Sequence, residues 1–159
     1  SFGTTPLRDV CKFRVESLLN YEDTHLDISK TSVWDDFHRQ LEIMKEQTVS
    51  FIREEVAKGK KVYGYGASTK GNTLLQYYGL TADDIVAIAE RSPAKYGKYT
   101  VGTNIPIVSE KVMREAEPDY LLVLPWHFIK EFLERESEFL DGGGKFIVPC
   151  PQFEVIGRD

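Results

Sequence analysis

The chain has 159 residues, of which 42% are hydrophobic and 28% charged, and its formal net charge is −5. This length suits one α/β domain with its own hydrophobic core. The negative charge argues against nucleic acid as the main partner, because a phosphate footprint needs clustered Lys and Arg. No apolar run approaches the roughly 20 residues of a membrane span, so we expect neither a membrane segment nor a signal peptide.

The two cysteines, Cys11 and Cys150, lie far apart and show no metal-binding spacing. We therefore expect a reducing, cytoplasmic setting. The chain begins at Ser1 rather than at methionine, which leads us to expect a piece of a longer protein.

Residues 1–31 predict a linker or N-terminal extension, in which Thr5-Pro6 favours the start of a helix and residues 21–30 favour a loop. From residue 32 a long helix is predicted to end at Lys58-Gly59, a cation and a glycine suited to a helix end. About 27 residues at 1.5 Å each span roughly 40 Å. Since this exceeds what a small sheet covers, we expect part of the helix to meet another domain or subunit, or to extend into solvent.

A glycine-rich turn then follows a short β-prone run and opens into a second helix. Its residues are Gly64, Tyr65, Gly66, Ala67, Ser68, Thr69, Lys70, Gly71 and Asn72. Gly64 and Gly66 can adopt positive φ and let a ligand approach the backbone, and the helix directs unpaired N–H groups to the same place. The pattern predicts an anion site, with a tight turn that holds no ligand as the alternative.

The turn departs from known phosphate motifs. In the dinucleotide fingerprint G-x-G-x-x-G the third glycine position is held here by Thr69, which we expect to keep the helix slightly further from its strand. A P-loop needs Lys and then Ser or Thr after its last glycine, but Asn72 and Thr73 follow Gly71. The pattern therefore indicates a phosphate-bearing ligand without defining its pose.

Residues 85–89 predict a strand buried on both faces, and Glu90 stands at its end, 24 residues beyond Gly66. In nucleotide-binding α/β domains a carboxylate here accepts hydrogen bonds from a ribose hydroxyl; a solvent-facing glutamate is the alternative. The long loop 91–106 carries Arg91 and Tyr99 at the sheet edge where such domains bind ligands. A plain surface loop is the alternative to a functional one.

The remaining elements alternate between helix and strand. We expect a helix at 109–118, a strand at 120–124, a helix over 125–140, a strand at 145–149 and an edge strand at 153–156. This order predicts an α/β, Rossmann-like three-layer fold with a mostly parallel sheet, preceded by a long N-terminal helix.

Trp126 and His127 follow the strand at 120–124, at the same edge of the sheet. An indole there could stack on a base or sugar, and an imidazole could donate to a phosphate or hydroxyl; a structural histidine is the alternative. No nucleophile elbow, carboxylate pair or metal-spaced set of His and Cys stands out. We therefore predict no catalytic and no metal-binding residue.

Residues 33–156 resemble the C-terminal domain of the sugar C-methyltransferases, which use S-adenosylmethionine to methylate nucleotide-linked deoxysugars. The resemblance is carried by four motifs in order: the glycine turn with its helix (64–75), the long loop (91–107), the strand ending in Pro-Trp-His-Phe (118–128) and the segment Phe-Ile-Val-Pro-Cys-Pro (146–151).

The resemblance implies a three-part enzyme: an N-terminal zinc-binding piece, a central S-adenosylmethionine domain that holds the catalytic residues, and a C-terminal domain that corresponds here to residues 32–159. Zinc and S-adenosylmethionine are thus implied for the full-length enzyme, with no cofactor bound by this domain alone. The implied partners are a nucleotide-linked sugar and the central domain, and the chain alone is not expected to methylate.

The predicted role of this domain is to position the substrate. The amides of residues 66–69 and the Lys70 ammonium would hold phosphate, Glu90 a ribose hydroxyl, and Trp126 the sugar or base side; relatives commonly carry aspartate in place of Glu90. The full predicted substrate-binding set is Gly64, Tyr65, Gly66, Ala67, Ser68, Thr69, Lys70, Asn72, Glu90, Arg91, Tyr99, Trp126 and His127.

Two functions of other classes stay open. The first is a stand-alone NAD(P)-type oxidoreductase domain, against which Thr69 and the lack of a catalytic set count. The second is a non-catalytic interaction module that uses the long helix 32–58 as an assembly surface.

Overall fold

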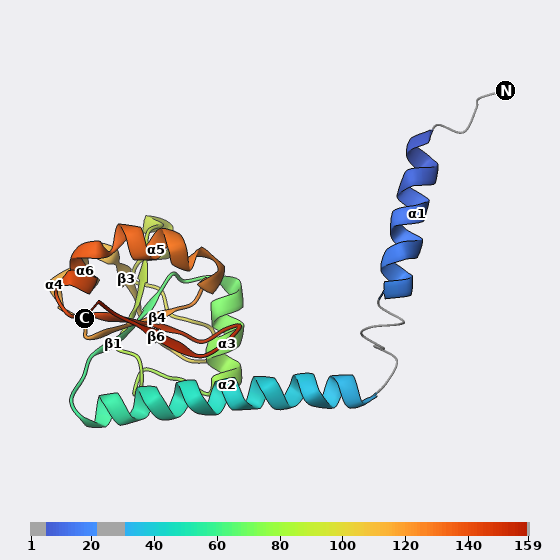
Figure 1. Ribbon diagram of the computed structural model, residues 1–159. Coiled ribbons are helices and arrows are strands. Elements are labelled where there is room, and N and C mark those ends of the chain that lie inside the picture. The colour runs from blue at the N-terminus through green and yellow to red at the C-terminus, as the bar shows by residue number, and fades with distance from the viewer. Residues whose placement is uncertain (1–5, 22–30, 159) are drawn as a thin grey trace. The chain divides into compact units, whose positions relative to one another are not determined.

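The computed structural model describes residues 6–21 and 31–158 (Figure 1). Two compact units can be separated, Ser1–Glu42 and Ile43–Asp159. The first contains helix α1 (Pro6–Tyr21), so the helix predicted after Thr5 is present. Of the loop expected over residues 21–30, Tyr21 instead ends α1, and residues 22–30 lie outside the described residues. The predicted domain boundary between residues 31 and 32 stays a prediction.

The long helix is confirmed as α2 (Thr31–Ala57), 27 residues in length. It ends where predicted, with Gly59 in the left-handed conformation at φ +82. In its last half Ile52 is buried in the core, and Glu55 accepts a hydrogen bond from the Tyr120 hydroxyl at 2.8 Å. In its first turns Trp34 and Phe37 are exposed. The apolar stripe of the helix is therefore buried near its C-terminal end and exposed at Trp34 and Phe37.

Six strands form one sheet in the described residues, in the order β3-β2-β1-β4-β5-β6. Their bounds are β1 (Val62–Tyr65), β2 (Ile88–Glu90), β3 (Ile107–Ser109), β4 (Tyr120–Val123), β5 (Lys145–Val148) and β6 (Glu154–Ile156). All neighbouring pairs are parallel except β5 and β6. The chain moves outward from β1 to β3 and then returns to β4, so the strand order reverses between β1 and β4, where open α/β sheets bind ligands.

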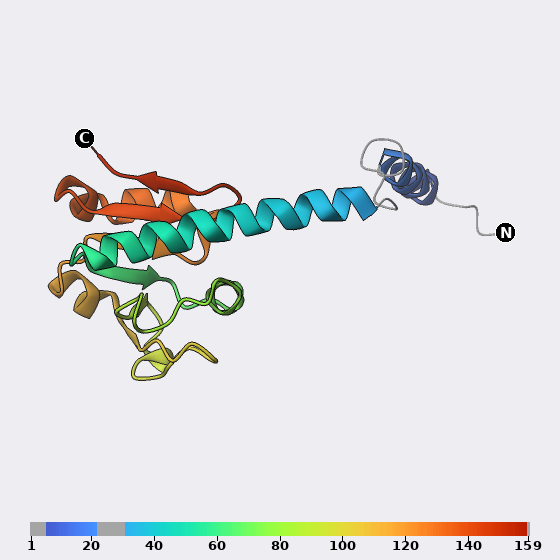
Figure 2. The ribbon, with the colours of Figure 1, turned by 90° about the horizontal axis from the view of Figure 1, so that it is seen from below.

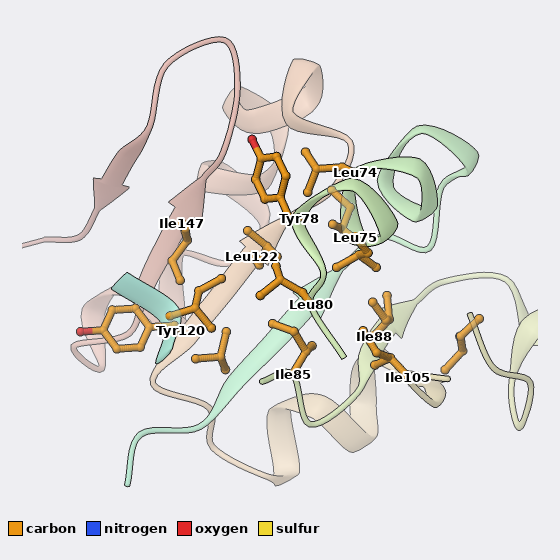
Figure 3. Close-up of a cluster of buried hydrophobic side chains, with 14 residues drawn as sticks. Leu74, Leu75, Tyr78, Leu80, Ile85, Ile88, Ile105, Tyr120, Leu122 and Ile147 are labelled. Atoms are coloured by element: carbon orange, nitrogen blue, oxygen red, sulfur yellow. The ribbon is translucent and has the colours of Figure 1, made fainter. Parts of the chain in front are cut away.

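Helices cover both faces of the sheet (Figures 1 and 2). On one face α3 (Thr69–Tyr78) and the end of α2 pack on a cluster that includes Leu75 and Leu122 (Figure 3). On the other, α4 (Glu110–Glu115), α5 (Ile129–Arg135) and α6 (Ser137–Asp141) pack on a cluster around Tyr65 and Phe146. Each fully buried aliphatic side chain stabilises the fold by about 1.5–3 kcal/mol. The predicted three-layer Rossmann-like fold is confirmed.

Three local predictions need correction. The strand expected at 85–89 begins only at Ile88, and Val86 is exposed. Strand β3 lies where only loop and helix were expected, because three residues carry too little pattern to be recognised. The single helix expected over 125–140 is divided into η3 (Trp126–Phe128), α5 and α6.

The break between α5 and α6 falls at Glu136, whose backbone leaves the helical region at φ −104 and ψ 34. Its side chain is 2% exposed and accepts hydrogen bonds from Tyr65 and Arg114. The helix is therefore interrupted at the residue whose carboxylate is directed into the domain.

Candidate ligand-binding site

The glycine turn lies at the carboxyl end of β1, beside the point where the strand order reverses. Gly66 has φ +84, and a Cβ atom there would lie 2.7 Å from Pro125 Cγ, so both the conformation and the space require glycine. Gly64, which could also adopt positive φ, is not in that conformation. Its lack of a side chain instead leaves room for Ile88, whose Cδ1 would lie 2.6 Å from a Cβ at this position.

Helix α3 begins directly after the turn. Ser68 is its N-cap and accepts a hydrogen bond from the Gly71 amide at 3.0 Å. A Cβ atom at Gly71 would lie 2.5 Å from Leu124 Cβ, so Gly71 allows the helix to pack closely on the end of β4. Thr69 was expected to hold the helix further away, but it is exposed, and the close approach occurs two residues later.

Glu90 holds the turn in place from the neighbouring strand β2. Its Oε2 accepts hydrogen bonds from the Ala67 amide at 3.1 Å and the Lys95 ammonium at 2.9 Å. Its Oε1 accepts from the amides of Arg91 and Ser92 at 2.9 and 3.0 Å. Because a carboxylate has about four acceptor sites, these bonds occupy it within the chain, and its predicted ribose contact stays a prediction.

The charge on Glu90 is stabilised by these donors. Burial would raise the pKa of the Glu90 carboxyl, but the Ser92 amide and the Lys95 ammonium outweigh burial and hold this pKa below its ordinary value. Lys95 also donates to the Ala67 carbonyl at 2.8 Å. Glu90 and Lys95 thus bind both backbone groups of Ala67.

Most of the amides predicted to hold phosphate already have acceptors. The Gly66 amide donates to Ala89 O at 2.8 Å, and the Ser68 amide donates to Gly66 O at 2.9 Å. In the part of the chain that the structure describes, the amides of Thr69 and Lys70 have no acceptor. These two amides, at the positive end of α3, and the exposed Lys70 side chain therefore remain for an anion.

Two hollows adjoin the turn and share Ala67 and Ser68 as walls. The first, of about 360 Å³, we call the charged hollow; it is lined by Tyr65, Gly66, Ala67, Ser68, Glu90, Arg91, Lys95, Glu110, Pro125, Phe128, Glu131, Phe132 and Arg135. The second, of about 270 Å³, we call the neutral hollow; it is lined by Ala67, Ser68, Thr69, Asn72, Leu75, Tyr99, Thr100, Val101, Ile107 and Leu124. The turn therefore separates a hollow lined by many charged side chains from a hollow lined by none.

A hydrogen-bonded network joins three residues that line the charged hollow, Tyr65, Glu110 and Arg135, to the buried Glu136. Arg135 Nη2 donates to the Tyr65 hydroxyl at 2.6 Å and to Glu110 Oε1 at 2.9 Å. The Tyr65 hydroxyl donates to Glu136 Oε1 at 2.5 Å. Burial and the bond to Glu136 raise the pKa of the Tyr65 phenol above its ordinary value, so it stays protonated and can donate. Arg135 was not predicted as a site residue, because no motif surrounds it.

The structure brings most of the predicted residues to these two hollows. Trp126 and His127 line neither: Trp126 is half-buried and packs against both core clusters, and His127 is exposed beside Phe128, with ring centroids 4.2 Å apart. Phe128, which was not predicted, lines the charged hollow instead. Asn72 lines the neutral hollow, and its Oδ1 is enclosed without a hydrogen-bond partner in the structure.

A larger hollow of about 560 Å³ lies elsewhere, next to Asp119 and Gly144 at the amino ends of β4 and β5. Ligands of open α/β sheets bind at the carboxyl ends of the strands, so its size does not make it the preferred site. Over residues 6–21 and 31–158, no group of three or more His, Cys, Asp and Glu side chains could hold a metal ion. The described side chains therefore do not fit a zinc site. No helix in these ranges is long and apolar enough to cross a membrane.

The reversal of strand order, the glycine turn beside it and the helices on both faces define a Rossmann-like α/β domain. Residues 7–151 match the C-methyltransferase C-terminal domain, and the chain belongs to this family, as its motifs predicted. The C-methyltransferase NovU of Streptomyces niveus is 37% identical over 138 residues, which are 87% of this chain and 33% of that protein. The chain thus spans about one third of the length of this relative.

Proposed function

We propose that this domain binds a nucleotide-linked sugar at the glycine turn and positions it for methyl transfer in a longer protein. The observation that carries the proposal is the pair of hollows that meet at Ala67 and Ser68, in a chain of the C-methyltransferase family. A nucleotide-linked sugar has two bulky ends joined by a diphosphate. Two hollows on either side of an anion-compatible turn have the matching arrangement.

The diphosphate would lie at the start of α3. The amides of Thr69 and Lys70, which have no acceptor among the described residues, lie at this end of the helix, and the helix dipole favours negative charge there. The Lys70 ammonium would add a flexible positive charge. The tie between Ala67 and Glu90 would keep the turn from moving when the ligand binds.

The contribution of this domain to the reaction is orientation, because holding a substrate in a reactive geometry removes entropy from the barrier. The chemistry of methyl transfer would come from the S-adenosylmethionine-binding central domain, and zinc would bind in a further part of the longer protein. That central domain is the partner that we propose for this chain. The cytoplasmic location of this chain, expected from its two cysteines, stays a prediction.

Calorimetric titration of the chain with dTDP-glucose, NAD and S-adenosylmethionine tests the proposal. We expect heat with dTDP-glucose alone, and weaker binding in Lys70→Ala; Lys111→Ala, an exposed lysine on α4, is the matched control. Heat with NAD alone would favour the oxidoreductase domain. Silence with all three ligands would favour the interaction module.

A further inference from the structure

The two hollows beside the glycine turn differ in the chemistry of their walls. The charged hollow is lined by six charged side chains: Glu90, Arg91, Lys95, Glu110, Glu131 and Arg135. The neutral hollow contains no charged residue. A ligand with two chemically different ends will therefore prefer one orientation across the turn.

The neutral hollow suits a flat heterocycle. Tyr99 on its wall is 63% exposed, and an exposed aromatic ring can stack on any nucleobase. Two hydrogen bonds hold the segment that follows Tyr99: Thr100 Oγ1 accepts from the Ile105 amide at 2.9 Å, and Gln76 Nε2 donates to Val101 O at 2.9 Å. Little ordering of this wall would be needed on binding.

Asn72 also favours a nucleobase in the neutral hollow. Its Oδ1 is enclosed and meets no donor from the described residues, which is unfavourable for a buried polar atom. A nucleobase carries N–H groups along its edge, and an N–H that met this carbonyl after a rotation of the side chain would satisfy it. A neutral heterocycle would also bring no charge into a hollow that has none to pair with it.

The charged hollow suits a sugar ring. Arg135 lines it, with its guanidinium held by Tyr65, Glu110 and Glu131. Charged groups such as those that line this hollow form strong hydrogen bonds with hydroxyls. Phe128, 50% exposed, supplies an apolar surface for the C–H face of the ring. A nucleobase here would have to displace water from these charges without pairing them.

We infer that the nucleotide-linked sugar crosses the turn in one direction, with its base against Tyr99 and Asn72 and its sugar against Phe128 and Arg135. This inference rests on the proposed function and deepens it. It makes Tyr99 a determinant of nucleotide binding and Phe128 a determinant of sugar binding.

The test compares dTDP with dTDP-glucose by calorimetry on the chain and its variants. We expect Tyr99→Ala to weaken both ligands alike, roughly ten-fold or more, which is the scale of one lost base stack, and Tyr99→Phe to restore both. We expect Phe128→Ala to weaken dTDP-glucose several-fold and leave dTDP unchanged. Val112→Ala, an exposed apolar residue on α4 that lines neither hollow, is the matched control. Thermal unfolding by circular dichroism checks that each variant is folded.

The results distinguish a failure of the proposed function from a failure of the proposed ligand orientation. If the unmodified chain binds neither ligand, the proposed function fails and the orientation fails with it. If it binds dTDP-glucose but Tyr99→Ala leaves dTDP unchanged, or Phe128→Ala weakens dTDP as much as dTDP-glucose, the orientation alone is overturned.

Discussion

The carboxylate of Glu90 supports the glycine turn, and replacing it with an amide tests that role. In Glu90→Gln the side chain keeps one carbonyl oxygen, which can still accept from the amides of Arg91 and Ser92. Its new NH₂ group would face the Ala67 amide and the Lys95 ammonium, which are both donors. Two hydrogen bonds would therefore be lost together, and the one from Lys95 is also the ion pair.

The expected loss follows from these contacts. A hydrogen bond to a charged group contributes about 1.5–3 kcal/mol, but the bond to Lys95 is discounted because the Lys95 side chain is 44% exposed. With the Glu90 side chain 13% exposed, we expect the free energy of unfolding to fall by about 2–3 kcal/mol. For a domain of this size that lowers Tm by about 6–9 °C.

Urea unfolding followed by circular dichroism measures this change. The matched control is Glu131→Gln, an exposed carboxylate that pairs with Arg135 at 3.3 Å and should change the free energy of unfolding by less than about 0.5 kcal/mol. If Glu90→Gln is as stable as the control but binds dTDP-glucose more weakly, Glu90 serves the ligand rather than the turn, and the structural argument is refuted.

Three further outcomes are expected. Gly71→Ala should lower the free energy of unfolding by about 1–3 kcal/mol, because the alanine Cβ would lie 2.5 Å from Leu124 Cβ and this clash outweighs the better helix propensity of alanine. Urea unfolding measures the change, and Gly142→Ala is the control, since a Cβ at Gly142 would make ordinary contacts and its φ is negative. Asn72→Ala should raise the free energy of unfolding by about 0.5 kcal/mol or more, because it removes an enclosed carbonyl that has no partner among the described residues. It should also weaken the binding of dTDP in calorimetry. A loss of stability would show that the carbonyl has a partner in solution. The pKa of Glu90 is lower in the folded state, so its stabilising effect should be present above the unfolded pKa of about 4.3 and disappear as pH falls through the folded pKa. In urea unfolding from pH 7 to pH 3, the free energy of unfolding should therefore decrease less in Glu90→Gln than in the unmodified chain.

The positions of the segments that form the candidate site were predictable from the sequence, because each leaves a local pattern. The apolar run of β4 and the glycine turn after β1 are contiguous signals, and the end of α2 is marked by Gly59. Such signals depend on backbone sterics and on periodicity within a few residues. They sufficed for the α/β class, the family and the edge of the sheet where the candidate site lies.

The partners of individual side chains required the tertiary structure. Tyr65 and Arg135 are 70 residues apart and meet because β1 and α5 pack face to face. The close-approach glycine is Gly71 rather than the residue at the motif position, since the end of β4 sets the available space.

The sequence thus determined the alternation of strands and helices apart from β3, the glycine turn and the membership of the C-methyltransferase C-terminal domain family. Tertiary structure alone decided that Glu90 is occupied by backbone amides, that Trp126 packs against the core clusters while Phe128 lines a hollow, and that charge lies on one side of the turn. The physical reason is that secondary structure follows from neighbours along the chain. Hydrogen-bond partners and burial follow instead from residues that only folding brings together.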